Sequence, residues 1–138
     1  MAKIAIKARL ILYHKGKILL LKQTKPNGGN YTLVGGTVES FETARDSLIR
    51  ESYEEAGIRL QADDLRLVHV LHKHKKKQTR IVLYFKAYRW EGELKARETK
   101  KFKETEWFSL DQLPDNLTST VQHVLDEYRK GILYSEMQ

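Results

Sequence analysis

Hydrophobic and polar positions alternate at the beginning of the chain. Charged residues such as Lys7 and Arg9 stand between apolar ones, which are Ile4, Ile6, Ala8, Leu10 and Leu12. A period of two is typical of a β-strand with one buried face. After a turn at residues 14–16, the segment KILLLKQ (residues 17–23) is more continuously apolar, which favours a central strand.

The period becomes helical between Thr43 and Ala56. A turn at residues 25–30 and a short strand at residues 31–34, which ends at Gly35 and Gly36, come first. Small or apolar residues then recur at four-residue steps, at Ala44, Leu48, Ser52 and Ala56. Thr43 with Asp46 resembles a capping box, and Gly57 is a good helix stop. The pattern predicts an amphipathic helix over residues 43–56.

The second half of the chain predicts strands followed by a helix. Residues 65–72 and 79–90 read as an antiparallel hairpin around a basic loop, and residues 105–110 as another short strand. A final helix begins at Thr118 or Ser119, ends before Gly131, and has an apolar face made of Val121, Val124, Leu125 and Tyr128. This order of elements implies an α/β or α+β fold, with a mixed β-sheet sandwiched between α-helices.

Length and composition are those of an ordinary globular protein. The chain has 138 residues, of which 41% are hydrophobic and 31% charged, so we expect one domain over residues 1–138. The absence of cysteine excludes disulfide scaffolds, cysteine-ligated zinc and thiol nucleophiles, and it fits a cytoplasmic location. Lysines interrupt the first 17 residues and no apolar run reaches 18, so we expect neither a signal peptide nor a membrane span.

The net charge of +7 suits an anionic partner such as a nucleotide, polyphosphate or RNA, although it also fits simple solubility. The hairpin loop carries much of it, at Lys73, Lys75, Lys76, Lys77 and Arg80. These side chains either contact such a partner or only face water.

Three glutamates run against this basic background. Glu51, Glu54 and Glu55 share one face of the predicted helix near its C-terminal end. Their like charges repel, and they oppose the helix dipole as well. A divalent cation such as Mg²⁺, which takes carboxylate oxygens, would resolve both conflicts. A solvated acidic face is the alternative, and the spacing alone does not decide between them.

The surroundings of these glutamates resemble the motif of the Nudix hydrolases. The pattern G-x5-E-x7-R-E-U-x-E-E-x-G-U, in which U is aliphatic, is matched by Gly36, Glu42, Arg50, Glu51, Glu54, Glu55, Gly57 and Ile58. Ser52 departs from it, because it stands where an aliphatic residue is usual. The flanking segments NYTLVGG and EWFSLDQLP are also similar to the family, except that Val34 occupies a position often held by proline.

The resemblance implies hydrolysis of a nucleoside diphosphate linked to a further group X, with Mg²⁺ or Mn²⁺ as the cofactor. The implied metal ligands are Glu51, Glu54, Glu55 and the carbonyl of Gly35. Glu51 or a residue outside the motif would deprotonate the attacking water. The implied catalytic set is Glu51, Glu54, Arg50 and Glu104, in which Glu104 supplies a further carboxylate and Glu106 is its rival. The implied orienting residues are Gly36, Glu42, Arg50 and Gly57, with Arg50 paired to Glu42.

The resemblance leaves the substrate open among an ordinary or oxidised nucleoside triphosphate, a nucleotide sugar and ADP-ribose. Action on RNA 5′ ends is one alternative, with RNA as a less favoured partner, and a non-catalytic regulatory module is another. We expect a monomer or homodimer. Tyr31, Phe85 and Trp90 would either stack a base or belong to the core. His69, His72 and His74 lack a convincing carboxylate or thiol partner, so we do not expect a transition-metal site there.

Overall fold

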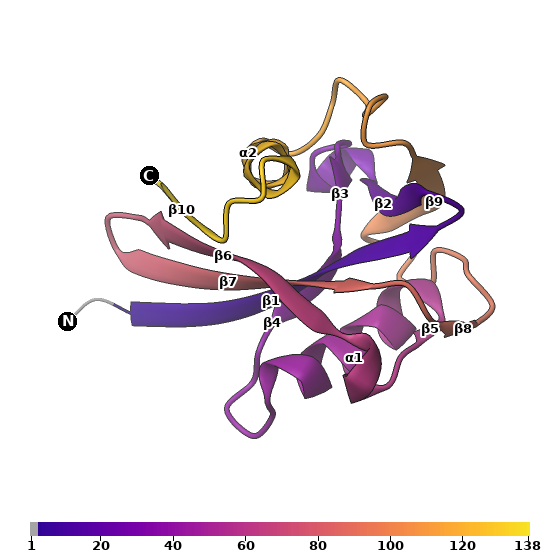
Figure 1. Ribbon diagram of the computed structural model, residues 1–138, viewed down its shortest axis with the longest axis horizontal. Coiled ribbons are helices and arrows are strands. Elements are labelled where there is room, and N and C mark those ends of the chain that lie inside the picture. The colour runs from indigo at the N-terminus through magenta and orange to yellow at the C-terminus, as the bar shows by residue number, and fades with distance from the viewer. Residues whose placement is uncertain (1–2) are drawn as a thin grey trace.

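The computed structural model describes residues 3–138. Helices α1 (Ala44–Ala56) and α2 (Ser119–Arg129) lie on opposite faces of a mixed β-sheet, with α1 beneath the sheet and α2 above it in Figure 1. This confirms the expected sandwich. Within the described range, no helix combines the length and the apolar character needed to cross a membrane.

The larger sheet follows the order β10-β6-β7-β1-β2-β3, while β4 pairs with β1 and β9 pairs with β2. Its strands are β1 (Lys3–His14), β2 (Lys17–Gln23), β3 (Tyr31–Thr32), β4 (Val34–Thr37), β6 (Arg66–His74), β7 (Gln78–Ala87), β9 (Phe102–Phe108) and β10 (Tyr134–Met137). The pairs β1 with β7 and β10 with β6 are parallel, and the other pairs are antiparallel. A separate small sheet joins β5 (Ile58–Arg59) to β8 (Glu91–Gly92), and 3-10 turns cover Lys25–Asn27 and Ala62–Asp64.

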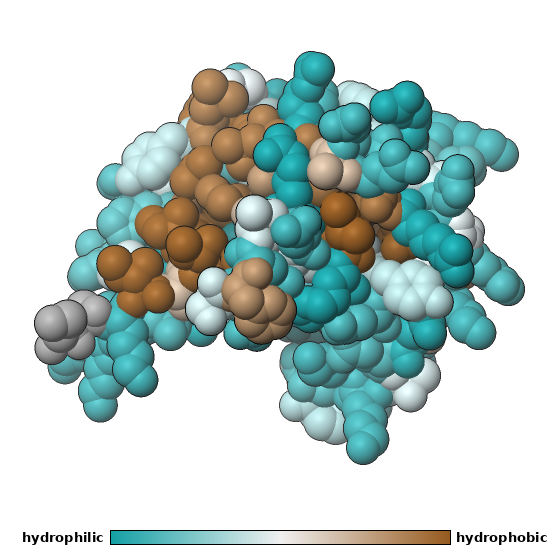
Figure 2. Space-filling view, turned by 90° about the horizontal axis from the view of Figure 1, so that it is seen from below, coloured by the Kyte–Doolittle hydropathy of each residue, from teal (hydrophilic) through white to brown (hydrophobic). Residues whose placement is uncertain are grey.

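Strand β1 organises the sheet, and its burial differs from the prediction of one buried face. Its second half is buried on both faces, since Leu10, Ile11 and Leu12 are at most 1% exposed. At its beginning Ile4 is 70% exposed and Ile6 is 44% exposed. Figure 2 shows apolar side chains gathered beside the start of the chain on the lower face of the sheet, where α1 does not cover it. A large exposed apolar patch is a candidate contact surface.

Several strands differ from the predicted ones. The antiparallel hairpin of β6 and β7 is confirmed, but both strands extend into the predicted loop, so that only residues 75–77 connect them. Residues 31–34 do not form one strand, and Gly35 and Gly36 lie inside β4 because they pair with β1. Strand β10, which the pattern did not predict, adds to β6 through residues that are at least partly exposed.

Both ends of α1 are held by the residues that the sequence suggested. The Thr43 hydroxyl accepts a hydrogen bond from the Asp46 amide at 3.1 Å. Gly57 ends the helix at φ 71°, and a Cβ at this position would lie 2.5 Å from the carbonyl oxygen of Glu93. These two residues fix where α1 begins and where it ends.

Ser52 and Ser47 provide a matched test of the helix packing. Both are fully buried in α1, but the Ser47 hydroxyl donates to the Thr37 carbonyl at 3.3 Å, whereas the Ser52 hydroxyl has no partner among the described residues. We expect Ser52→Ala to raise the free energy of unfolding by about 1 kcal/mol, because it removes an unsatisfied buried hydroxyl. Ser47→Ala should lower it by about 1 kcal/mol.

Urea unfolding of the two variants measures this difference. The gain in helix propensity on changing serine to alanine is common to both and cancels in the comparison. Equal changes in the two variants would contradict the prediction.

Candidate active site

Three carboxylates from two segments converge at the C-terminal half of α1. Glu51, Glu55 and Glu98 each offer an oxygen, and these oxygens lie within 4.8 Å of one another. Glu51 and Glu55 are one helical turn apart, whereas Glu98 comes from the connection between β8 and β9. Sequence reasoning missed Glu98, because no motif spacing links it to the helix.

The backbone explains how Glu98 reaches the helix. The last carbonyls of α1 have no partner inside the helix, and the connection supplies donors for them. The Arg97 amide donates to the Glu55 carbonyl at 2.9 Å, and the Lys95 amide donates to the Ala56 carbonyl at 3.1 Å. The guanidinium of Arg97 also donates to the Tyr53 carbonyl at 3.3 Å. Glu98 is therefore placed by hydrogen bonds that cap the helix.

Glu55 is the buried member of this acidic group. It is 3% exposed, and its Oε1 accepts a hydrogen bond from the Gly35 amide at 3.0 Å. Burial raises the pKa of Glu55 to about 8, and the nearby charges of Glu51 and Glu98 raise it further, against the lowering effects of the Gly35 amide and Arg9. A cation at this point would favour the ionised carboxylate.

Two glycines allow β4 to pass this close to the acidic group. Gly35 has φ 144°, and a Cβ there would lie 2.1 Å from the Ala8 carbonyl oxygen. A Cβ on Gly36 would lie 2.9 Å from the Glu51 carboxylate. The Gly35 carbonyl, predicted as a metal ligand, accepts a hydrogen bond from Arg9 Nη1 at 3.2 Å. Its role as a ligand stays a prediction.

Arg50 ties the remaining acidic residues of the motif together. Its Nη2 and Nε contact the two oxygens of Glu42 at 2.8 and 3.2 Å, so the expected pair with Glu42 is present. Nη1 lies 3.0 Å from Glu51 and 3.3 Å from Glu54. The Arg50 hydrogen bond, together with that of the Glu39 amide, lowers the pKa of Glu42 to about 2. Arg50 thus orients Glu51, while the Glu54 side chain is 47% exposed and lies outside the converging group.

Glu104 and Glu106 do not belong to the converging group either. Both are exposed on β9, opposite Lys22 and Leu20 of β2. Burial raises the pKa of Tyr31, and the charges of these two carboxylates raise it further, which places them near that ring. The structure therefore brings Glu98 to the acidic group instead, and a catalytic role for Glu104 stays a prediction.

A cavity of about 370 Å³ opens over the acidic group. Its lining includes Glu51, Glu55 and the two glycines of β4, and three basic residues, Lys7, Arg9 and Lys101. Glu39, Phe102 and uncharged polar residues complete it. Converging carboxylate oxygens fit a hard divalent cation. The cations beside them fit phosphate oxygens. This arrangement can neutralise both ends of a metal–phosphate complex.

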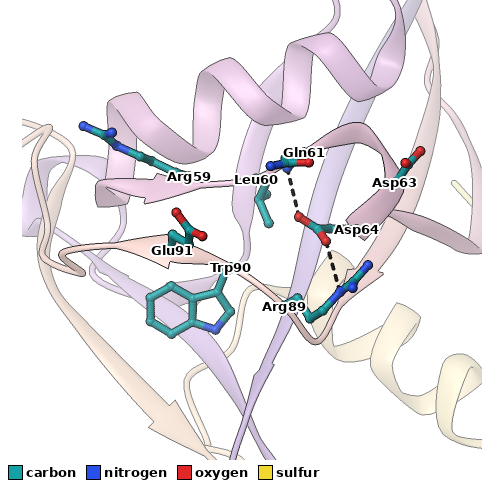
Figure 3. Close-up of a pocket in the computed structure, with 8 residues that line it drawn as sticks. All are labelled: Arg59, Leu60, Gln61, Asp63, Asp64, Arg89, Trp90 and Glu91. Atoms are coloured by element: carbon teal, nitrogen blue, oxygen red, sulfur yellow. Dashed lines mark hydrogen bonds and ion pairs between the residues drawn. The ribbon is translucent and has the colours of Figure 1, made fainter.

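A second cavity lies at the small sheet of β5 and β8 and shares no residue with the first one (Figure 3). Asp64 occupies its middle, where it accepts a hydrogen bond from the Gln61 amide at 3.0 Å and pairs with Arg89 at 3.4 Å. Trp90 lines this cavity and packs against Trp107, with ring centroids 6.0 Å apart. Asp64 already has partners there, so we assign no chemistry to this cavity.

The remaining candidates from the sequence lie in the core or at strand pairs. Tyr31 is 8% exposed and Phe85 is 3% exposed, so both belong to the core. His69 is buried between the Ile132 carbonyl and the Ser135 hydroxyl, each at 2.8 Å. His72 and His74 pack against each other farther along β6.

The raised pKa of Glu55 predicts how stability depends on pH in the absence of metal. Its folded pKa of about 8 lies above the ordinary value of 4.5, so the folded state binds more protons between these limits. The resulting stabilisation is complete below the ordinary pKa and is lost as the pH rises through the folded one. The Tm of both proteins is to be measured in a chelator at about pH 5 and about pH 8.5. Over this range the Tm of the wild type should fall by at least about 5 °C more than the Tm of Glu55→Gln. Parallel pH profiles of the two proteins would contradict this.

Known proteins share this fold and this sequence pattern. The model of the NUDIX domain matches residues 4–128. The chain is 31% identical over 121 residues to an ADP-ribose pyrophosphatase of Methanocaldococcus jannaschii, which covers 87% of this chain and 70% of that protein. It is 29% identical over 106 residues to the NAD-capped RNA hydrolase NudC of Pectobacterium carotovorum, a match that covers 76% of this chain but only 39% of NudC.

Solved structures agree with the sequence matches. A MutT NUDIX hydrolase from Burkholderia pseudomallei superimposes with a TM-score of 0.80 at 27% identity, covering 90% of this chain and 97% of that one. A MutT protein from Methanosarcina mazei shares the fold, with a TM-score of 0.79 at 20% identity over 94% of this chain and 95% of that one. The chain belongs to the Nudix family.

Proposed function

We propose that this protein is a Mg²⁺-dependent Nudix hydrolase that cleaves the pyrophosphate linkage of a nucleoside diphosphate joined to a group X. The observation that carries the proposal is the convergence of Glu51, Glu55 and Glu98. The first two line a cavity whose lining also contains three basic residues. The candidates for the substrate are a nucleoside triphosphate, an oxidised nucleotide, a nucleotide sugar and ADP-ribose. The match to an ADP-ribose pyrophosphatase supports this range.

The residues of the acidic group have distinct roles in this proposal. Glu51, Glu55 and Glu98 would hold the metal, with Glu54 joining from the rim and the Gly35 carbonyl as a further ligand. Bound Mg²⁺, or Mn²⁺ in its place, would neutralise charge on the phosphate oxygens and acidify a water molecule. Arg50 keeps Glu51 in position through its contact at 3.0 Å. Glu51 or a carboxylate outside the motif would take the proton of the attacking water.

The basic residues that line the cavity would bind the substrate. Lys7, Arg9 and Lys101 face the same space as the acidic group. Their charges can bind phosphate oxygens that the metal does not reach, which holds the scissile linkage still. Phosphoryl transfer depends mainly on such positioning and charge neutralisation. A cytoplasmic location and a monomeric or homodimeric state complete the proposal.

We expect Glu51→Gln, Glu54→Gln and Glu55→Gln each to lower kcat/KM by about a hundredfold at saturating Mg²⁺, because each removes a ligand charge. Initial rates over nucleoside triphosphates, oxidised nucleotides, nucleotide sugars, dinucleoside polyphosphates and ADP-ribose measure this and name the substrate. Variants that keep wild-type rates across Mg²⁺ concentrations, or a wild-type protein that turns over none of these compounds, would refute the proposal.

Glu98 and Glu104 compete as the carboxylate from outside the motif, and the geometry favours Glu98. We expect Glu98→Gln to lower kcat/KM by about a hundredfold, while Glu93→Gln stays within about threefold of wild type. Glu93 is an exposed glutamate of the same connection and is therefore a matched control. A loss in Glu104→Gln together with normal rates in Glu98→Gln would assign the role to Glu104.

Hydrolysis at RNA 5′ ends is the second candidate, favoured by the match to NudC and by the basic hairpin. Binding of RNA through Lys75, Lys76 and Lys77 would weaken steeply with salt. Neutralising these three lysines should then slow turnover of capped or triphosphorylated RNA more than turnover of mononucleotides. Unchanged RNA turnover in that variant would remove this candidate.

A further inference from the structure

A narrow extension leads away from the acidic group along the α2 side of the sheet. This cavity, of about 170 Å³, shares Lys7, Arg9, Gln23 and Thr32 with the larger one. It ends at Lys73, Arg80 and the first residues of α2, including Thr120. We call this extension, bounded by Lys7, Arg9, Lys73 and Arg80, the basic cavity.

The register of the sheet explains why these cations share one face. Arg9 of β1 stands between Gly35 of β4 and Tyr84 of β7. Arg80 of β7 pairs with Lys73 of β6. Val82, two residues away on the same face of β7, pairs with Lys7 of β1. Side chains two positions apart point to the same side, and neighbouring strands are about 4.8 Å apart. The cations therefore form a continuous row that begins at the acidic group.

These cations have neutral partners only. Within residues 3–138, no salt bridge joins Lys7, Arg9, Lys73 or Arg80 to a carboxylate. Lys73 donates to the Thr120 hydroxyl at 2.7 Å, Arg80 to the Gln78 side-chain oxygen at 3.1 Å, and Arg9 to backbone carbonyls at 3.2 Å. In the described part of the chain, none of these four charges therefore has a carboxylate at salt-bridge distance.

Mutual repulsion among them is visible in the pKa values. Burial lowers the pKa of Lys7, and the charges of Arg9, Arg80, Lys75 and Lys73 lower it further. Burial likewise lowers the pKa of Lys73, followed by the charges of Lys75 and Arg80. An anion bound between these side chains would offset both effects.

The beginning of α2 adds to the positive potential. Thr118 precedes the helix but makes no side-chain capping hydrogen bond, and both Thr118 and Thr120 line the basic cavity. The first amides of a helix and its dipole favour negative charge. This contribution supports the row of cations without replacing it.

The basic cavity exposes no aromatic ring on which a nucleobase could stack. Its one aromatic residue, Tyr84, is 1% exposed and lies beneath the surface of the sheet. The other lining residues are cations, threonines, a glutamine and two valines. Such a lining recognises phosphate oxygens rather than a flat, uncharged ring.

We propose that the basic cavity binds phosphate groups of the substrate that lie beyond the scissile pyrophosphate. The preferred group X is then free of a base at this position and carries its own phosphates, as a polyphosphate chain or a phosphorylated sugar or polyol does. The position of the scissile bond rests on the proposed function. The affinity of the cavity for phosphate does not.

Calorimetric titration of the full chain with inorganic tripolyphosphate, in a chelator, tests the cavity without the metal or catalysis. We expect Lys73→Gln/Arg80→Gln to bind tripolyphosphate at least about tenfold more weakly than wild type. Lys76→Gln/Lys77→Gln removes the same charge from exposed residues of the hairpin loop and should stay within about twofold. In wild type, the NMR signals of the Thr120 and Val121 amides should shift on titration.

Two outcomes of the titration overturn the proposal. Wild-type affinity in Lys73→Gln/Arg80→Gln would show that the cavity does not hold the anion. An equal loss in both double variants would place the anion on the hairpin loop, as RNA binding would require. Equal melting temperatures of the variants and the wild type exclude misfolding as the cause, and Lys73→Arg/Arg80→Lys, which keeps the charge, should restore binding.

Kinetics separate a failure of this inference from a failure of the proposed function. Under Mg²⁺, KM for adenosine 5′-tetraphosphate and for an ADP-linked sugar or polyol phosphate should rise at least about tenfold in Lys73→Gln/Arg80→Gln, with kcat less affected. The compound with the larger rise identifies the source of the phosphates. If the double variant hydrolyses both compounds with unchanged KM, only the inference about the basic cavity is overturned. Tripolyphosphate binding by a protein that hydrolyses nothing overturns the proposed function alone.

Discussion

The contact between Gly35 and Glu55 is the constraint on which the rest of the site depends. The hydrogen bond from the Gly35 amide at 3.0 Å ties β4 to a carboxyl that is almost fully buried beneath it. It exists because Gly35 has no side chain, since a Cβ would collide with the Ala8 carbonyl oxygen. With β4 held against β1 on one side and α1 on the other, the positions of Gly36 and Glu51 follow. Glu98 then joins through the capping of the last carbonyls of α1 by the connection that carries it.

A divalent cation was one expected way to relieve the repulsion among the glutamates of the motif, and the structure adds Arg50 as another. Arg50 contacts Glu42, Glu51 and Glu54 at 2.8 to 3.3 Å, so these three carboxylates share one guanidinium as their counter-ion. Repulsion at Glu55 is avoided in another way, because burial raises the pKa of this carboxyl to about 8 and favours its neutral form. The acidic face therefore divides into a partly solvated group whose charge Arg50 partly offsets and a buried carboxyl whose neutral form is favoured. A divalent cation would displace the proton of Glu55, but the carboxylates are already arranged before it binds.

Local signals in the sequence predicted α1 well, because its cap at Thr43, its stop at Gly57 and its four-residue period all lie within the helix itself. The Glu42–Arg50 pair was implied by the resemblance to the Nudix motif, and the structure contains it. Glu98 was not predicted, since its approach depends on backbone hydrogen bonds between segments about 40 residues apart, for which no periodicity exists. The prediction for strand β1 failed for a related reason. Alternation predicts one buried face, but the burial of each residue depends on how far α1 and α2 extend over the sheet. Ile4 is therefore exposed and Ile11 is buried. Strand β10 has only four residues and no buried one, which leaves hardly any pattern to read.

The positions of the charges in space are the feature that the sequence alone predicts least well. A net charge of +7 is compatible with solubility or with any anionic partner, and only the strand register places Lys7, Arg9, Lys73 and Arg80 in one row. Arg9 belongs to both halves of the cleft, because it donates to the Gly35 carbonyl and lowers the pKa of Glu55 while it lines the basic cavity. An anion bound at Arg9 would compete with that carbonyl for the guanidinium, and a cation at Glu55 would repel it. If the two halves are linked in this way through one guanidinium, thermodynamic reciprocity requires each ligand to alter the affinity for the other by the same factor.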